Sequence, residues 1–342
     1  MGKKLGAFNR IIYWINILAA ILLLISFVLP YLPPARFPNI SLLSIAVSPL
    51  IVINILFVVY WLFKLKKFVL LSLSIIIIAY FHFGSFYKFS TNEVKVASNN
   101  SLKILSFNVR LFNLYESKDK QKNIPEMVSS YLKKEKPDVL CLQEYNDEMK
   151  LDFSDYPYKY IHFKDKNILG HAIFSKYPLV NTYSFDFDHS YNNTISADII
   201  KGTDTIRVYN IHLQSLSIKA SVSYLQEVDN EVLRKRISTR FVKQQEQVEA
   251  ILEHKQNLKF PVVFSGDFNN TPFSYVYHKV SENMNDAFVE SGNGLGTTYL
   301  FESYPMRIDY ILASKELKIL NFSTIKKTFS DHYPITATIG WD

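Results

Sequence analysis

Several short apolar segments after residue 100 of the chain end in a carboxylate, an amide or an imidazole. Such groups can bind a hard metal ion, position a water molecule or donate hydrogen bonds to a phosphoryl group. Each signal is weak alone, since an Asn at a strand end is usually a turn residue. Strand ends meet at one edge of a sheet, however, so distant segments can build one site there. The segments are Ser106-Phe107-Asn108, Leu142-Gln143-Glu144, Tyr209-Asn210-Ile211-His212, Ser265-Gly266-Asp267-Phe268-Asn269, Arg307-Ile308-Asp309-Tyr310 and Ser330-Asp331-His332.

The hydrophobic pattern around these segments predicts one alternating α/β domain over residues 102–342. Short apolar runs alternate there with stretches in which apolar residues recur at helical spacing. Helices are predicted around 124–132 and 236–254, and Lys201-Gly202-Thr203-Asp204 predicts the turn of a β-hairpin. The predicted strands cover 103–110, 139–142, 172–175, 195–200, 205–213, 261–265, 307–313 and 335–339.

Residues 1–89 have the composition of a membrane anchor. The first 90 residues contain eight Lys or Arg and no Asp or Glu. Three apolar stretches each reach the roughly 20 residues that cross a bilayer as a helix. A cleaved signal peptide would have a shorter apolar core and would not be followed by two further stretches of this kind. The predicted transmembrane helices cover about 11–29, 40–63 and 68–87, and residues 90–101 form a polar linker.

The basic residues around these stretches predict the orientation of the anchor. Three of them precede the first stretch and three more fill the link 64–67, whereas the connection 30–39 contains only Arg36. Cytoplasmic segments carry the excess of Lys and Arg. We therefore expect a multi-pass membrane protein whose catalytic domain is extracytoplasmic, which means periplasmic in a bacterial inner membrane.

Charge argues against a general DNA-binding protein. The net charge of +7 comes from the anchor, because the rest of the chain has 30 basic and 31 acidic residues. Nonspecific binding to duplex DNA uses many Lys and Arg contacts to phosphate. The segment 233–243 has five basic residues and is either a solvated helix or a phosphate-binding surface. The single cysteine, Cys141, excludes an internal disulfide and a cysteine-rich zinc site.

Taken together, these segments resemble the endonuclease/exonuclease/phosphatase superfamily, whose members include deoxyribonuclease I-like nucleases, inositol polyphosphate phosphatases and sphingomyelinases. The resemblance spans roughly residues 102–340, and its most specific parts are QE, NIHL, GDFN, RIDYIL and SDHYPI. It implies a four-layer α/β sandwich, in which two packed mixed β-sheets are flanked by helices. It also implies a metal-dependent phosphoric ester hydrolase.

The resemblance further implies a metal site at the strand ends. Glu144 matches the central metal ligand of the family, Asn108 lies beside it as a ligand or a substrate contact, and Asp331 supplies either a second oxygen or a water-mediated contact. Mg²⁺ prefers oxygen ligands and needs only one or two carboxylates, so we expect Mg²⁺, with Mn²⁺ as the alternative. Zinc is not expected, because the chain has no cysteine pair and no His-Glu-x-x-His helix.

Catalytic roles follow from the same resemblance. Asp267 matches the residue that orients or deprotonates the attacking water, and Asn269 beside it holds either the phosphate or Asp267. His332 and Asp309 form an orienting pair, because a carboxylate on one ring nitrogen fixes the tautomer of a histidine.

The remaining candidates surround these groups. His212 matches the histidine that donates to a non-bridging phosphate oxygen, and Asn210 falls on the same face of its strand, so it is expected at the site too. Arg110 stands where some relatives have an acidic residue, and it is either a phosphate contact or an ion-pair partner. His171 is either a substrate contact or a surface residue.

These observations favour a membrane-anchored, Mg²⁺-dependent phosphoesterase that hydrolyses a phosphodiester or phosphomonoester, such as a phospholipid headgroup or another small phosphoester. Its partners are then the lipid bilayer and the phosphoester. The first alternative is an extracytoplasmic endonuclease or exonuclease, with nucleic acid as a less favoured partner. The second is a noncatalytic membrane receptor or scaffold, which the intact set of polar strand ends argues against.

Overall fold

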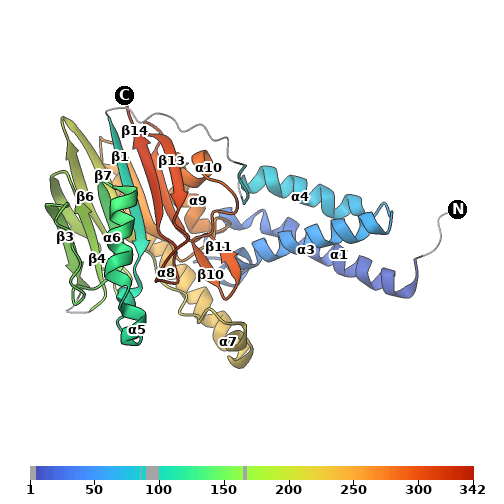
Figure 1. Ribbon diagram of the computed structural model, residues 1–342. Helices are drawn as coiled ribbons and strands as arrows, with labels where there is room; N and C mark the ends of the chain where they lie inside the picture. The colour runs from blue at the N-terminus through green and yellow to red at the C-terminus, as the bar shows by residue number, and fades with distance from the viewer. Residues whose placement is uncertain (1–4, 85, 90–99, 165–167) are drawn as a thin grey trace.

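The computed structural model describes residues 5–84, 86–89, 100–164 and 168–342. Three apolar helices form a bundle that lies against one side of an α/β domain built from two β-sheets (Figure 1). Most of the linker predicted at 90–101 lies outside the described residues, and Ser101 already begins the first strand.

The helices of the bundle are α1 (Ala7–Ser26), α3 (Leu43–Phe63) and α4 (Val69–Phe83). Two segments, Ala7–Tyr31 and Pro38–Phe63, are long and apolar enough to cross a membrane, with mean hydropathies of 2.6 and 2.7. The third predicted span is shorter than expected. The helix α4 has 15 residues and ends before Gly84, whose φ of +70° leaves the helical region.

The bundle has apolar side chains on its outside, and inside it a small polar group lies among buried apolar side chains. Asn16, Asn54 and Ser72 are fully buried between the helices. Asn16 Nδ2 donates to Ser72 Oγ at 2.5 Å, and Ser72 Oγ donates to Asn54 Oδ1 at 3.1 Å. Trp61 Nε1 donates to Asn16 Oδ1 at 2.9 Å. The outward-facing residues include Phe8, Trp14, Leu18, Leu56 and Phe81, each more than half exposed.

The α/β domain contains two mixed six-stranded sheets and a short hairpin. In each sheet one central pair is parallel, β1 with β2 and β7 with β8, while the other pairs are antiparallel. The first sheet has the order β13 (Lys318–Thr324), β14 (Ile335–Gly340), β1 (Ser101–Asn108), β2 (Val139–Tyr145), β4 (Gly170–Ser175), β3 (Tyr158–Phe163). The second has the order β5 (Leu179–Ser184), β6 (Thr194–Lys201), β7 (Asp204–His212), β8 (Val262–Asp267), β12 (Asp309–Ser314), β9 (Met284–Asp286), and the hairpin is β10 (Tyr299–Phe301) with β11 (Tyr304–Met306).

Helices cover the outer faces of the two sheets, which confirms the predicted sandwich. The helix α6 (Ile124–Glu135) packs Ile124 and Val128 on the outer face of the first sheet. On the second sheet, α8 (Asn230–Gln256) and α9 (Tyr275–Ser281) do the same with Val248 and Val276. Shorter helical segments are η1 (Leu29–Tyr31), α2 (Pro38–Ser41), η2 (Arg110–Asn113), α5 (Lys118–Gln121), α7 (Val222–Glu227) and α10 (Ala287–Ser291).

Candidate active site

The space between the two sheets changes from apolar to polar along the strands. Successive side chains of a strand point to opposite faces, so residues an even number apart share one face. Ile104, Ile173, Val208, Val263 and Ile311 form the apolar core between the sheets. Two or four positions away on the same faces, always toward the same end of the sheets, the residues are polar and almost fully buried: Asn108, His171, His212, Asp267 and Asp309. The strand-end residues predicted from the sequence therefore meet between the sheets.

Strand pairing brings three of these residues together on the second sheet. His212 of β7 is paired with Asp267 of β8, and Asp267 is paired with Asp309 of β12. Gly266 makes the first pairing sterically feasible, because a Cβ at this position would lie 1.9 Å from the backbone oxygen of Ile211. Its φ of +146° also favours glycine.

Glu144 reaches the site through a β-bulge. Two residues of β2, Gln143 and Glu144, stand opposite the single residue His171 of β4. In a regular strand Glu144 would share the outer face of Leu142, but its φ of +49° turns the chain. Its Oε1 accepts a hydrogen bond from Asn108 Nδ2 at 3.2 Å. Burial raises the pKa of Glu144, and its side chain stays one quarter exposed.

Asp267 is held by amide groups on both carboxylate oxygens. Its Oδ1 accepts from the backbone N–H of Asn269 at 2.8 Å. Its Oδ2 accepts from Asn108 Nδ2 at 3.1 Å and from Asn269 Nδ2 at 3.2 Å. Burial raises the pKa of Asp267. Asn108 thus links Glu144 to Asp267, while its own Oδ1 accepts from the backbone N–H of Arg110 at 3.0 Å.

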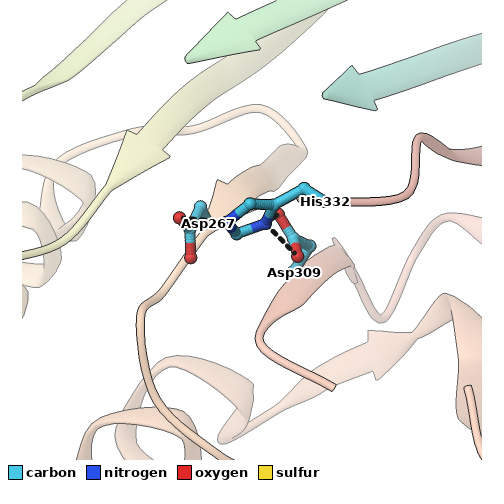
Figure 2. A group of neighbouring side chains, drawn as sticks. All are labelled: Asp267, Asp309 and His332. Atoms are coloured by element: carbon cyan, nitrogen blue, oxygen red, sulfur yellow. Dashed lines mark hydrogen bonds and ion pairs between the residues drawn. The ribbon is translucent and has the colours of Figure 1, made fainter. Parts of the chain in front are cut away.

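His332 lies between two carboxylates, as Figure 2 shows. Its Nδ1 is 2.9 Å from Asp309 Oδ2 and 3.1 Å from Oδ1, and its Nε2 is 3.6 Å from Asp267 Oδ2. Burial alone would lower the pKa of His332, but the charges of Asp309 and Asp267 raise it above its usual value. The imidazole can therefore carry a proton on the nitrogen that faces Asp267.

His212 faces the carboxylates of Glu144 and Asp267. Its Nε2 is 3.7 Å from Glu144 Oε1 and also 3.7 Å from Asp267 Oδ2. A residue that the sequence analysis missed, Asn192, places Nδ2 at 2.7 Å from the same nitrogen. Because the backbone N–H of Ser215 donates to Asn192 Oδ1 at 3.1 Å, the amide nitrogen must face His212. In the sequence, Asn192 in Ser190-Tyr191-Asn192-Asn193 has only the signature of a turn.

Two predicted residues lie behind the site. His171 is buried, with Nε2 at 3.4 Å from His212 Nδ1, and burial lowers its pKa to about 3. A position on the surface, one of the two alternatives for His171, is thereby wrong. Asn210 is fully buried one step deeper, where its Nδ2 donates to the backbone oxygens of Leu142 and Ala172, each at 2.9 Å. It joins the two sheets below the site.

Arg110 and Asp331 form the exposed rim, with side chains 46% and 44% exposed. Arg110 Nε is 3.9 Å from Asp331 Oδ2, and its NH2 group is 3.2 Å from Glu116 Oε1. Arg110 is thus an ion-pair partner beside Glu144. The chain turns sharply here, because the residues of η2 all have φ between +47° and +56°.

The donor set of the site fits a hard divalent cation. Asp267, Asp309 and His332 have potential ligand atoms within 4.8 Å of one another. The charges of Asp309 and Asp267 raise the pKa of His332, however, so its imidazole favours the protonated form and is less suited to a metal than the carboxylate oxygens. Glu144 and Asp331 add two carboxylates that are partly accessible to solvent. Such a predominance of oxygen donors suits Mg²⁺ or Mn²⁺.

A cavity of about 800 Å³ adjoins the site. Leu111 in its wall follows Arg110 in the chain, and Ser190 accepts a hydrogen bond from the backbone N–H of Asn192 at 3.1 Å. Two tyrosines in the wall, Tyr115 and Tyr191, are 79% and 74% exposed. The other lining residues are Lys164, Ile168, Leu169 and His189.

Comparison with protein families gives two matches. The sequence profile of the endonuclease/exonuclease/phosphatase family matches residues 105–332. A profile for a domain of unknown function matches residues 9–86. No curated protein matches the chain.

Solved structures share the fold of the α/β domain. An endonuclease/exonuclease/phosphatase from Bacteroides vulgatus is 17% identical with a TM-score of 0.53, covering 71% of this chain and 99% of that one. TDP2 from D. rerio in complex with a single-strand DNA product is 17% identical with a TM-score of 0.52, covering 70% and 99%. An endonuclease/exonuclease/phosphatase from Beutenbergia cavernae is 14% identical with a TM-score of 0.51, covering 71% and 72%.

Proposed function

Because the chain belongs to the endonuclease/exonuclease/phosphatase family and is a metal-dependent phosphoric ester hydrolase, we propose that it is anchored in a membrane and hydrolyses a small phosphoester, such as a phospholipid headgroup. One observation carries the proposal. Glu144, Asp267, His212, His332 and Asp309 come from five separated segments and converge at one end of the two sheets.

Glu144 and Asp331 are the residues that we propose to hold Mg²⁺, with Mn²⁺ as the alternative. When bound, the ion would neutralise negative charge on the phosphoryl group and on the leaving oxygen. Asn108 directs its N–H groups to Glu144 and Asp267, and thereby fixes the spacing of the two carboxylates. A direct bond from Asn108 to the metal, which the resemblance implies, stays a prediction.

Asp267 is the residue that we propose to orient the attacking water and to accept its proton. Three amide N–H groups fix the position of its carboxylate, and burial raises its pKa toward that of a useful base. His332 and His212 face the same carboxylate, at 3.6 and 3.7 Å. We assign His332 to the stabilisation of charge on the phosphoryl oxygens. His212 Nε2 accepts a hydrogen bond from Asn192, so the donation to a phosphoryl oxygen that the resemblance implies stays a prediction and requires that hydrogen bond to open. Asp309 orients His332, and Arg110 at the rim is placed to meet the anionic substrate.

The cavity beside the site supports a substrate with a small organic group next to the phosphate. Its volume falls in the range of sites for small molecules. Tyr115, Tyr191 and Leu111 supply aromatic and apolar surface, and Lys164 supplies positive charge. An extracytoplasmic nuclease is the second candidate, since the structure of D. rerio TDP2 contains a single-strand DNA product and bases stack on exposed tyrosines.

The bundle supports membrane anchoring by its arrangement as well as its composition. The outside of a water-soluble bundle would be largely polar, but here large apolar side chains cover the outside, and hydrogen-bonded amides lie within among buried apolar side chains. Lipid favours this arrangement, because the hydrogen-bonded amides hold the helices together while apolar side chains contact the acyl chains. Three crossings and an extracytoplasmic domain remain our proposal. The start of α1 and the link 64–67 lie at the end of the bundle away from the domain (Figure 1).

The proposed substrate class is tested with the purified full-length chain in nanodiscs. We expect Mg²⁺-dependent hydrolysis of an aryl phosphodiester, and faster hydrolysis of phospholipid-headgroup esters than of single-stranded DNA. Tyr191→Ala should raise KM for the preferred ester, whereas Tyr158→Ala, an exposed tyrosine outside the cavity lining, should leave it unchanged. Faster cleavage of DNA would favour the nuclease, and no hydrolysis of any ester would favour the scaffold.

A further inference from the structure

The membrane anchor contacts two segments that adjoin catalytic carboxylates. One is the loop that follows Asp267, and the other is the hairpin β10–β11 that precedes Asp309. Figure 1 shows this hairpin beside the end of α3. We propose that the anchor is a structural part of the active site, and that Thr271 and Tyr304 are positioning residues through which α3 holds the catalytic groups in place.

Thr271 connects the first of these segments to the anchor. It is 4% exposed, and its Oγ1 donates to the backbone oxygen of Ser44, in the first turn of α3, at 3.0 Å. It lies four positions after Asp267. The backbone N–H of Thr271 donates to Asn270 Oδ1 at 2.9 Å, within the loop that follows Asp267.

Phe273 strengthens the same contact with apolar surface. It is 2% exposed and belongs to the apolar cluster formed by α1, α3 and α4, with Leu23, Val47 and Ile75 among its members. Its ring meets that of Phe83 edge to face, with centroids 4.9 Å apart. A domain tethered only by a flexible linker would not bury a phenylalanine in the core of its anchor.

The hairpin makes the second, independent connection. The side chain of Tyr304 in β11 lies next to that of Ser48 in α3. On the neighbouring strand, the ring of Tyr299 lies 5.0 Å from that of His332, centroid to centroid. Thr298, just before that strand, accepts a hydrogen bond at Oγ1 from the backbone N–H of Asp309 at 3.1 Å.

Both connections bear on one catalytic distance. A shift of the loop would move Asp267, and a shift of the hairpin would move His332 and Asp309. The distance affected is that between His332 Nε2 and Asp267 Oδ2, which is 3.6 Å. Ser44 and Ser48 lie one turn apart on α3, so a single rigid helix supports both sides of this contact. Catalytic rate depends steeply on such geometry, since a displacement of about 1 Å can cost about 10²-fold.

The test uses the full-length chain in nanodiscs with a soluble aryl phosphodiester, and hydrolysis by the unaltered chain establishes the assay. Thr271→Val removes the hydroxyl at nearly constant volume and should lower kcat about tenfold while KM changes less than about twofold. Thr271→Ser keeps the hydroxyl and should restore kcat. Tyr304→Phe, which acts on the other connection, should also lower kcat.

Asn39→Ala is the matched control. Asn39 of α2 accepts hydrogen bonds from Arg234 at 2.6 Å and from Ser238 at 3.2 Å, so its loss also weakens the contact between anchor and domain, but away from both catalytic segments. It should leave kcat unchanged. Rates are normalised to the folded fraction from thermal unfolding. Wild-type kcat in both Thr271→Val and Tyr304→Phe would overturn the proposal, as would a Thr271→Ser variant as slow as Thr271→Val. An equal loss of kcat in Asn39→Ala would also overturn the proposal. If Thr271→Val does not fold, the kcat of Tyr304→Phe alone decides.

Discussion

Replacing Asp309 by Asn tests whether this carboxylate acts only through His332. The substitution preserves the size of the side chain and leaves an amide oxygen that can still accept from His332 Nδ1. It removes the negative charge from a contact whose two partners are 3% and 5% exposed. If Asp309 only orients and supports the imidazole, the variant should lose kcat while KM changes little.

The expected size of this effect follows from the geometry. Both carboxylate oxygens lie within 3.1 Å of His332 Nδ1, so the pair belongs to the charged hydrogen bonds, which contribute about 1.5–3 kcal/mol, against about 1 kcal/mol for a neutral one. The difference of about 0.5–2 kcal/mol corresponds to a loss of about 2–30-fold in kcat. Complete removal of the imidazole in His332→Ala should cost more, about 10²–10⁴-fold.

The assay is steady-state hydrolysis of an aryl phosphodiester by both single variants and by the double variant. Because the two residues act as one unit, the double variant should be about as slow as His332→Ala alone. Thermal unfolding is measured in parallel, since His332→Ala leaves the buried carboxylate of Asp309 without its ring partner. Losses that multiply in a folded double variant would refute the assignment of Asp309 to His332.

Three further predictions concern other parts of the molecule. Glu144→Gln removes charge at constant volume, so activity and Mg²⁺ dependence should fall together; hydrolysis that persists in excess chelator would contradict the metal mechanism. Gly266→Ala forces a Cβ to 1.9 Å from the oxygen of Ile211, and should lower the free energy of unfolding by about 2–5 kcal/mol in denaturant titrations; unchanged stability would show that the two strands can separate freely. A periplasmic phosphatase reporter fused after Ser101 should be active and a cytoplasm-only fluorescent reporter dark, and the reverse pattern would invert the proposed topology.

Local sequence predicted eight of the strands, their faces and most of the composition of the site. It did not predict β3, β5, β9, β13 or the hairpin β10–β11. Alternation along a strand placed His212 on the inner face of β7, two residues after Asn210, and the structure has them there. The apolar stretches at the N-terminus indicated helices, of which two are long enough to span a membrane. The acidic and amide residues at strand ends were recognisable because strand period and residue type are local properties, which need no knowledge of what packs opposite.

Contacts between distant segments were decided only by the tertiary structure. The bulge that turns Glu144 inward depends on how β2 pairs with β4, and neither strand shows it alone. Asn192 looks like a turn residue until its loop closes over His212. The sequence pattern likewise did not show whether Asn210 contacts the substrate or is buried. In the structure it is buried and hydrogen-bonded to the other sheet.

The docking of Thr271 on α3 is a long-range case, because the two partners are 227 positions apart in the sequence. Hydrophobic periodicity specifies which face of an element is buried, and it does so for each element separately. Which element covers that face depends on how well the two whole surfaces fit. Hydrogen bonds such as that of Thr271 form only after the surfaces have packed together. That information is spread over the entire chain and becomes readable only once the chain has folded.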